Sequence, residues 1–270
     1  MPKLLLGLFL LLFYNCYSQS DHTIKSFKKD SGFFKSFDNT PIYYEISGKG
    51  DPVVLVHGFL NTSENWKRTA LFNDLISNGF QVITLDLRGN GKSGKLHSEQ
   101  GYANDAEAKD IIGLTRFLNI GHYDIIGYSR GSIITARVLL LDKKVKKAVI
   151  GGMGTGFTNP QWPRRIQFYE AFSGKPTKQL EPMMANVRKM GLDTMELAYQ
   201  QKQQPSTTPD ELSKIRKKVL VICGDHDEDN GSANDLAKMI HSSILIIVPG
   251  DHGGASKTKE FSEAVISFLK

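Results

Sequence analysis

The chain is poor in cysteine, with only Cys16 and Cys223 among its 270 residues. Cys16 lies in an N-terminal segment that has the features of a cleaved signal peptide. Removal of this segment would leave Cys223 as the only cysteine, so the mature chain could form no internal disulfide. A protein exported without disulfides must be stabilised by its hydrophobic core, which a chain of this length can supply because the buried fraction of the surface rises with size.

The chain also lacks an N-terminal apolar run long enough to cross a bilayer, which takes about 20 residues. The run from Leu4 to Phe13 has ten residues, follows Lys3 and is followed by small polar residues. A basic tip, a short apolar segment and small residues are typical of a secretory signal peptide. We therefore expect residues 1–20 to be a signal peptide and the mature protein to be exported, either to the periplasm or out of the cell.

Small residues offer a signal peptidase two sites, after Ser18 and after Ser20. Lipid attachment at Cys16 is the less favoured alternative, because Asn15 is bulkier than the residue that usually precedes a lipidated cysteine. We expect contact with the membrane only through this N-terminal signal.

Basic residues are only modestly in excess, with 34 Lys and Arg against 28 Asp and Glu and a net charge of +6. Ten of the basic and six of the acidic residues lie between residues 152 and 217. The sequence holds no basic motif interleaved with aromatics and no nucleic-acid-binding module, so we expect no nucleic-acid partner. The basic excess could attract anionic substrates or lipid headgroups, although a solvated surface is the favoured interpretation.

Motifs for metals and cofactors are lacking as well. The histidines are scattered, and none pairs with a second ligand at a spacing typical of zinc sites. The glycine-rich stretch from Asp86 to Ser93 does not match the phosphate-binding patterns for dinucleotides or nucleoside triphosphates. We expect no cofactor and no metal.

Strand and helix patterns alternate through most of the chain, after a polar lead-in over residues 21–32. A hairpin is predicted first, with strands at Phe33–Ser36 and Ile42–Ile46. Short apolar runs predict buried strands at Val53–Val56, Gln81–Leu85, Tyr123–Ile126, Lys146–Ile150, Val219–Ile222 and Ile244–Ile247. Helical periodicity is found at Thr62–Ser77, Ala103–Leu118, Ile133–Leu141, Ser232–Ile240 and Lys257–Leu269. This alternation predicts an α/β protein with a doubly wound, mostly parallel sheet.

The alternation breaks between residues 152 and 216, where three helical patterns and no strand are found. The patterns cover Trp162–Phe172, Leu180–Met190 and Thr194–Gln201. We expect a helical cap over 152–216, inserted after the sixth strand and dividing the core into residues 21–151 and 217–270, with Pro205 to Pro209 as the linker back. Five of the seven methionines lie in this cap; an adaptable apolar cavity and the cap's own core account for them equally well.

The most informative motif is Gly127-Tyr128-Ser129-Arg130-Gly131, which stands between a predicted strand and a predicted helix. A strand that turns through Gly-x-Ser-x-Gly into a helix is the nucleophile elbow of serine hydrolases. The turn strains the serine backbone and requires small residues on both sides. Backbone N–H groups at the helix N-terminus favour negative charge beside the hydroxyl. We predict that Ser129 is a nucleophile; the alternative is a serine that only fills a tight turn.

From about Phe33 onward the sequence resembles the α/β-hydrolase family. The matching motifs, in order, are His57-Gly58-Phe59, Asp86–Ser93, the Gly127–Gly131 elbow, Gly224-Asp225-His226-Asp227 and Asp251-His252-Gly253. The resemblance implies the α/β-hydrolase fold and an enzyme that uses a serine, a histidine and a carboxylate.

A serine hydroxyl needs a base to remove its proton as it attacks. His252 follows the last predicted strand, where the family places this base, although a surface loop histidine is the alternative. The histidine in turn needs a carboxylate that fixes its tautomer and stabilises the imidazolium. The family pattern places this acid third after Gly224, which selects Asp227. Asp225 is the second choice, and Glu228 and Asp229 are interpreted as solvated loop charges.

The tetrahedral intermediate carries an oxyanion that must meet preorganised donors. The resemblance implies the backbone N–H groups of Arg130 and Phe59. The Phe59 side chain either walls the acyl pocket or packs in the core. The Asp86–Ser93 stretch is interpreted as a structural brace beneath the site.

These features predict a serine hydrolase that cleaves a small to medium carboxylic ester. Thioesterases and cofactor-free, haloperoxidase-like members of the same fold are open alternatives. A non-catalytic ligand-binding protein on a hydrolase scaffold is the alternative of another class. Dehalogenases and epoxide hydrolases with an aspartate nucleophile are disfavoured, because position 129 is a serine. The oligomeric state is not predicted.

Overall fold

A computed structural model describes residues 30–270 of the chain. The predicted signal peptide, with its cleavage sites and Cys16, lies outside the described residues, as does most of the predicted polar lead-in. Across the described part of the chain, no helix combines the length and the apolar character needed to traverse a bilayer.

An eight-stranded sheet forms the centre of the molecule, with the order β1-β2-β4-β3-β5-β6-β7-β8. The strands are β1 Asp30–Lys35, β2 Pro41–Gly48, β3 Asp51–Val56, β4 Phe80–Leu85, β5 Tyr123–Tyr128, β6 Val145–Gly151, β7 Lys218–Gly224 and β8 Ser243–Val248. The pairs β1–β2 and β2–β4 are antiparallel and the other neighbours are parallel. The predicted α/β fold with a mostly parallel sheet is therefore confirmed. β1 begins at Asp30, so the hairpin takes in the end of the predicted lead-in.

Both faces of the sheet are covered by helices, as the continuously apolar strands require. The helices against the sheet are α1 Ser63–Lys67, α2 Ala70–Ser77, α3 Ala106–Phe117, α4 Arg130–Leu141, α9 Ala233–Met239 and α10 Lys259–Leu269. Helices α3, α4 and α9 bury apolar side chains on one face, and α1, α2 and α10 bury theirs on the other. Successive residues of a strand point to opposite faces of the sheet: Ile125 packs in the core under α3, α4 and α9, and Ile126 packs in the core under α1, α2 and α10.

The prediction of one helix over Thr62–Ser77 is wrong, because the structure has two helices with a break between them. Thr69 takes an extended conformation (φ −98°, ψ 152°), and its hydroxyl donates to the carbonyl of Trp66 at 2.7 Å. This local bond offers the backbone an alternative to a continuing helix. Helix α3 also begins later than predicted, because Asn104 and Asp105 adopt left-handed conformations with φ of 57° and 58°.

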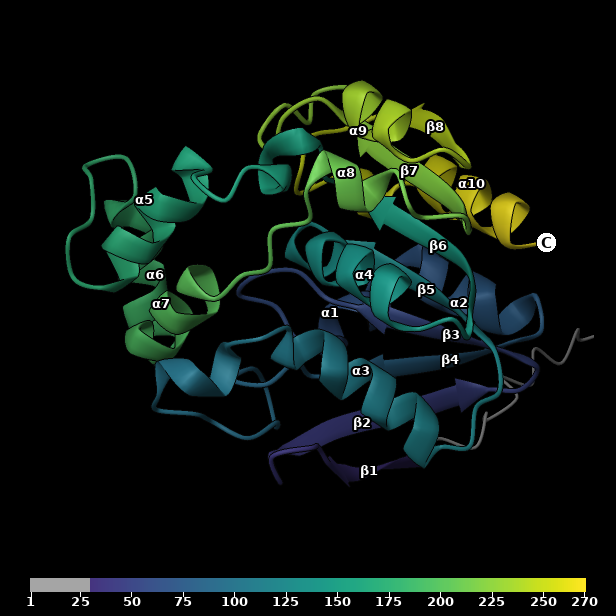
Figure 1. The fold of residues 1–270 in the computed structure, drawn as a ribbon, viewed down its shortest axis with the longest axis horizontal. Coiled ribbons are helices and arrows are strands. Elements are labelled where there is room, and N and C mark those ends of the chain that lie inside the picture. The colour runs from purple at the N-terminus through teal and green to yellow at the C-terminus, as the bar shows by residue number, and fades with distance from the viewer. Residues whose placement is uncertain (1–29) are drawn as a thin grey trace, which may run out of the picture.

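Three helices form a separate group beyond the carboxyl ends of the parallel strands (Figure 1). These are α5 Pro163–Phe172, α6 Glu181–Lys189 and α7 Thr194–Lys202. They follow β6, and the chain returns to the sheet through α8 Pro209–Leu212. Short 3₁₀ helices lie at Glu99–Tyr102, Thr155–Thr158 and Ala255–Lys257.

The α5–α7 group has its own apolar core, which includes Phe172, Met184 and Leu197. Phe59, from the loop after β3, packs against this core. The methionines of α6 thus serve helix packing, while Met190 and Met195 are exposed.

Candidate active site

The predicted elbow connects the end of β5 to the start of α4. Ser129 has φ 54° and ψ −124°, a conformation that a residue with a side chain rarely adopts. A Cβ atom on Gly127 would lie 2.3 Å from the Gly131 carbonyl oxygen, and one on Gly131 would lie 2.2 Å from the Val56 carbonyl oxygen. Only glycine fits at either position, so the strained turn and its two small neighbours are as the motif predicts.

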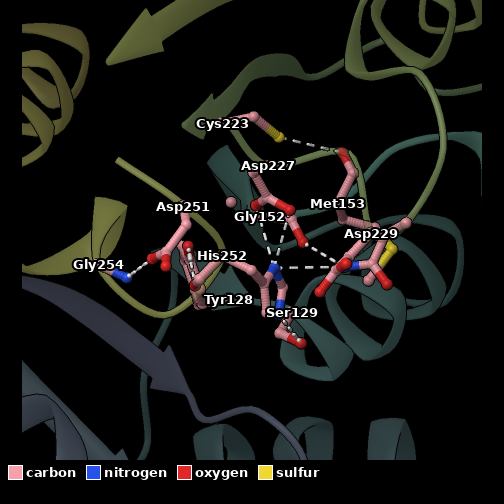
Figure 2. Close-up of polar contacts among 12 residues, drawn as sticks. Tyr128, Ser129, Gly152, Met153, Cys223, Asp227, Asp229, Asp251, His252 and Gly254 are labelled. Atoms are coloured by element: carbon pink, nitrogen blue, oxygen red, sulfur yellow. Dashed lines mark hydrogen bonds and ion pairs between the residues drawn. The ribbon is translucent and has the colours of Figure 1, made fainter. Parts of the chain in front are cut away.

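The three side chains singled out in the sequence lie in one hydrogen-bonded row (Figure 2). His252 Nε2 is 2.9 Å from Ser129 Oγ. On the other side of the ring, His252 Nδ1 is 3.1 Å from Asp227 Oδ1 and 3.0 Å from Asp227 Oδ2. The Asp227 side chain is 1% exposed, whereas that of His252 is 25% exposed. A proton on Nδ1 would be held by the buried carboxylate, which leaves Nε2 free to accept the proton of Ser129.

The other carboxylates of the loop after β7 point elsewhere. Asp225 accepts from the Gly250 N–H at 2.8 Å and lies 2.7 Å from His226 Nδ1. The Gly250 N–H bond, with His226 beside it, lowers the pKa of Asp225. Asp229 is half exposed and pairs with Arg164 at 3.2 Å, so it is not simply a solvated loop charge. Of these carboxylates, the structure brings Asp227 to His252 and leaves Asp225 at the rim.

Two residues that the sequence analysis did not single out also contact His252. The Tyr128 hydroxyl donates to the His252 carbonyl oxygen at 2.8 Å, and the two rings pack with centroids 5.6 Å apart. Asn230 Nδ2 lies 3.3 Å from His252 Nδ1 and donates to the Gly152 carbonyl at 3.1 Å. Tyr128 occupies a variable position of the elbow motif and Asn230 belongs to no motif, so no sequence signal marks either of them.

The two residues whose backbone amides are predicted to bind the oxyanion both lie close to Ser129: Arg130 follows it in the chain, and Phe59 borders the same two cavities. The Arg130 N–H is at the first position of α4, where a helix leaves its N–H groups without an intrahelical partner. Within residues 30–270, no hydrogen bond engages the Phe59 N–H. Both amides are thus available as donors.

The Arg130 side chain is held in an ion pair with Glu107. It is buried and donates to both carboxylate oxygens of Glu107, at 2.8 and 2.5 Å, and to the Gln200 carbonyl at 3.2 Å. It therefore ties the start of α4 to helix α3 and to the α5–α7 group.

The loop that carries Phe59 is braced by His57, which is fully buried. His57 Nε2 accepts from the Leu87 N–H at 3.0 Å, so its Nδ1 carries the proton and donates to the Gly58 carbonyl at 2.8 Å. Burial lowers the pKa of His57 and so favours this neutral form. The His-Gly motif thus shapes the loop after β3.

The Asp86–Ser93 loop is a brace, as its sequence suggests. The Asp86 carboxylate accepts from the backbone N–H groups of Ser63 and Lys92, each at 2.8 Å. A Cβ atom on Gly91 would lie 2.1 Å from an Asp86 carboxylate oxygen, so only glycine allows this close approach.

Two cavities flank the Ser129–His252 pair, and Phe59 borders both. The larger has a volume of about 390 Å³ and is lined also by Trp66, Arg68 and Lys257. The smaller, about 160 Å³, lies between helices α5 and α7 on one side and the start of α4 with the loops of Ser129 and His252 on the other. Phe59 stacks on Phe168 of α5, with ring centroids 6.1 Å apart, so its side chain both walls the cavities and packs.

Cys223 is buried near Asp227 and donates to the Met153 carbonyl at 3.5 Å. Burial, with the nearby Asp227, raises the pKa of this thiol to about 11. Cys223 is therefore a packed thiol and a poor nucleophile.

One group of side chains in the described chain could hold a metal ion, and the sequence analysis did not find it. His97 Nδ1 lies 3.3 Å from Asp193 Oδ2 and 3.8 Å from Glu196 Oε1. Burial raises the pKa of Glu196. His97 follows β4 whereas the carboxylates belong to the start of α7, so only the tertiary fold brings them together. The same three groups form an ion-pair cluster when His97 is protonated.

Several known proteins are similar in sequence to this chain. A sequence model of the alpha/beta hydrolase fold matches residues 51–167. A non-heme haloperoxidase of Rhodococcus erythropolis is 35% identical over 94 residues, which cover 33% of this chain and 34% of the relative. A bifunctional esterase/perhydrolase of Acinetobacter calcoaceticus is 24% identical over 280 residues, covering 88% of this chain and 99% of the relative. This chain matches less than half the length of the haloperoxidases that are at least 30% identical to it: the matched segments cover 34% to 43% of those proteins.

A solved esterase from Exiguobacterium antarcticum has a similar fold. Its TM-score is 0.73 at 23% sequence identity, and the match covers 89% of this chain and 99% of the esterase chain.

Proposed function

The chain is a member of the α/β-hydrolase fold family, and from that premise we propose that it is a serine hydrolase acting on small to medium carboxylic esters. The observation that carries the proposal is the row of polar contacts at the elbow. The Ser129 hydroxyl lies 2.9 Å from His252 Nε2, and the opposite ring nitrogen lies 3.0 Å from a buried carboxylate.

In the proposed reaction, Ser129 Oγ attacks the ester carbonyl carbon while His252 Nε2 takes its proton. The N–H groups of Phe59 and Arg130 donate to the oxyanion that forms. As the tetrahedral intermediate collapses, His252 returns the proton to the leaving alkoxide. Water, deprotonated by the same imidazole, then attacks the acyl-enzyme and releases the acid. Asp227 holds the proton on Nδ1 and stabilises the imidazolium throughout.

The volume beside Ser129 supports a substrate of modest size. The larger cavity, about 390 Å³, is near the lower end of the range of about 300–1,000 Å³ for small-molecule sites. Apolar walls such as Trp66 and Phe59 suit an acyl or alkyl chain.

Hydrolysis of 4-nitrophenyl esters from acetate to dodecanoate tests the proposal. We expect the best kcat/KM for a short or medium chain and a loss of about 10⁴-fold or more in kcat for Ser129→Ala. Ser129→Ala should unfold at the wild-type temperature, which separates loss of chemistry from loss of fold. A variant that kept most of the activity would exclude Ser129 as the nucleophile.

Perhydrolysis is a second candidate, favoured by the relatives that are named haloperoxidase and esterase/perhydrolase. Hydrogen peroxide would replace water as the attacking group, so that the acyl-enzyme yields a peracid and free Ser129. Peracid formation from acetate ester and hydrogen peroxide, measured beside ester hydrolysis, separates the two activities. Both should disappear together in Ser129→Ala.

A further inference from the structure

The smaller cavity at Ser129 is bordered by three arginines, and one of them has no anionic partner among residues 30–270. Arg130 is paired with Glu107, and Arg164 is paired with Asp229. Arg165, on the first turn of α5, borders the same cavity as Ser129 and His252.

The hydrogen bonds of Arg165 go only to backbone carbonyls within the described chain. Nη1 donates to the Gln204 carbonyl at 3.4 Å, and Nη2 donates to the Pro160 carbonyl. A guanidinium has five N–H donors arranged as a fork that fits a carboxylate. Most of the donor capacity of Arg165 is therefore free to meet a ligand in the cavity.

Arg165 is half-buried, and burial lowers the pKa of its guanidinium with no opposing contribution from an acidic neighbour. An arginine remains protonated nonetheless, so a positive charge faces the cavity. A desolvated cation is costly unless an anion or strong acceptors compensate it. No aspartate or glutamate of the described residues borders either cavity, so an entering anion meets no like charge there.

The cavity volume limits what the anion can be. At about 160 Å³ the space is smaller than sites for drug-sized ligands, which span about 300–1,000 Å³. It suits a segment of a few carbons that ends in a carboxylate. Trp162 and Phe168 supply apolar walls for the carbons, while Gln201 offers a polar side chain.

We propose that this cavity binds a carboxylate of the substrate through Arg165, and that the preferred esters carry a free carboxylate a few carbons from the scissile carbonyl or oxygen. The inference rests on the proposed serine hydrolase function and specifies its substrate class. Arg165 acts as a specificity residue: it fixes the far end of the substrate while Ser129 attacks the ester.

Two pairs of esters that differ only in charge test this inference. For the acyl side, 4-nitrophenyl hemisuccinate is compared with 4-nitrophenyl levulinate, its neutral isostere. For the alcohol side, 3-acetoxypropanoate is compared with 3-acetoxypropanamide, its neutral isostere, and acid release is followed in a pH-stat. The variants are Arg165→Gln, Arg165→Lys and, as a matched control, Arg188→Gln, because Arg188 is an exposed residue of α6 that pairs with Glu181.

We expect the wild type to prefer the anionic member of at least one pair. Arg165→Gln should lower the anionic-to-neutral ratio of kcat/KM in that pair by roughly 10- to 100-fold, as for loss of a charged hydrogen bond. Arg165→Lys should restore part of the ratio through its charge, and Arg188→Gln should leave the ratio at the wild-type value.

Two results would overturn the inference. One is a wild type that hydrolyses the neutral esters but prefers the anionic member of neither pair. The other is an Arg165→Gln variant in which the ratio does not change. In both cases hydrolysis of the neutral esters shows that the serine hydrolase proposal stands. If neither neutral nor anionic esters are hydrolysed, the proposed function fails and the inference fails with it.

Discussion

Replacing Asp227 by asparagine isolates what the buried carboxylate does for His252. The Asp227 side chain is 1% exposed, and both of its oxygens lie within 3.1 Å of Nδ1. An amide has no charge with which to stabilise the imidazolium, and its NH₂ group can favour the wrong tautomer. Two unit charges about 4 Å apart interact by about 4 kcal/mol at an effective dielectric of about 20. At about 1.4 kcal/mol for each factor of ten, this energy corresponds to about 10³-fold in rate.

We therefore expect Asp227→Asn to lower kcat by about 10³- to 10⁴-fold. The upper value includes the further loss that follows when His252 adopts the wrong tautomer. The assay is steady-state hydrolysis of a 4-nitrophenyl ester, with far-UV circular dichroism to verify the fold. Asp225→Asn is the matched control: it removes the same charge from the same loop, but at a side chain that is 46% exposed and bonded to the Gly250 N–H. It should lower kcat by less than about tenfold. A larger loss in Asp225→Asn than in Asp227→Asn would refute this assignment of the acid.

Other predictions concern stability and processing. Gly131→Ala should lower the free energy of unfolding by about 2–3 kcal/mol in urea denaturation, because the new Cβ would lie 2.2 Å from a backbone carbonyl of β3; a change below about 0.5 kcal/mol would contradict the elbow packing. Glu107→Ala should lower the free energy of unfolding by about 3–5 kcal/mol, because Arg130 would be left buried without its partner. A loss below about 1 kcal/mol would show that other groups or water compensate the charge of Arg130. Intact-mass measurement of the protein from its native host should give a chain that begins at Gln19 or Asp21; a retained N-terminal methionine would contradict cleavage, and a lipid-sized increment would indicate a lipoprotein.

The sheet could be predicted from the sequence because its strands are short, continuously apolar runs. Val53–Val56 and Val219–Ile222 are each completely buried between two helical layers. In a chain where strands and helices alternate, short apolar runs of this kind indicate buried parallel strands. The order of strands and helices could therefore be predicted. The elbow could also be predicted from the sequence, because steric crowding at Gly127 and Gly131 allows only glycine and so produces a recognisable motif.

Features that depend on tertiary contacts could not be predicted in this way. The break at Thr69 comes from one hydroxyl that turns back to the Trp66 carbonyl. The contact of Asn230 with His252 depends on the path of the loop after β7. That Arg165 has no acidic partner among residues 30–270 could not be predicted, because the sequence shows only an excess of basic residues in the predicted cap.

Covalent trapping tests whether Ser129 is a nucleophile that His252 activates. The protein is incubated with a fluorophosphonate, digested and analysed by peptide mass spectrometry, with His252→Ala in parallel. We predict one stoichiometric phosphonyl adduct, on the peptide that holds Ser129, and labelling slowed by several orders of magnitude in His252→Ala. No adduct, or an adduct on another residue, would contradict Ser129 as the nucleophile, and equal labelling of His252→Ala would contradict its activation by His252.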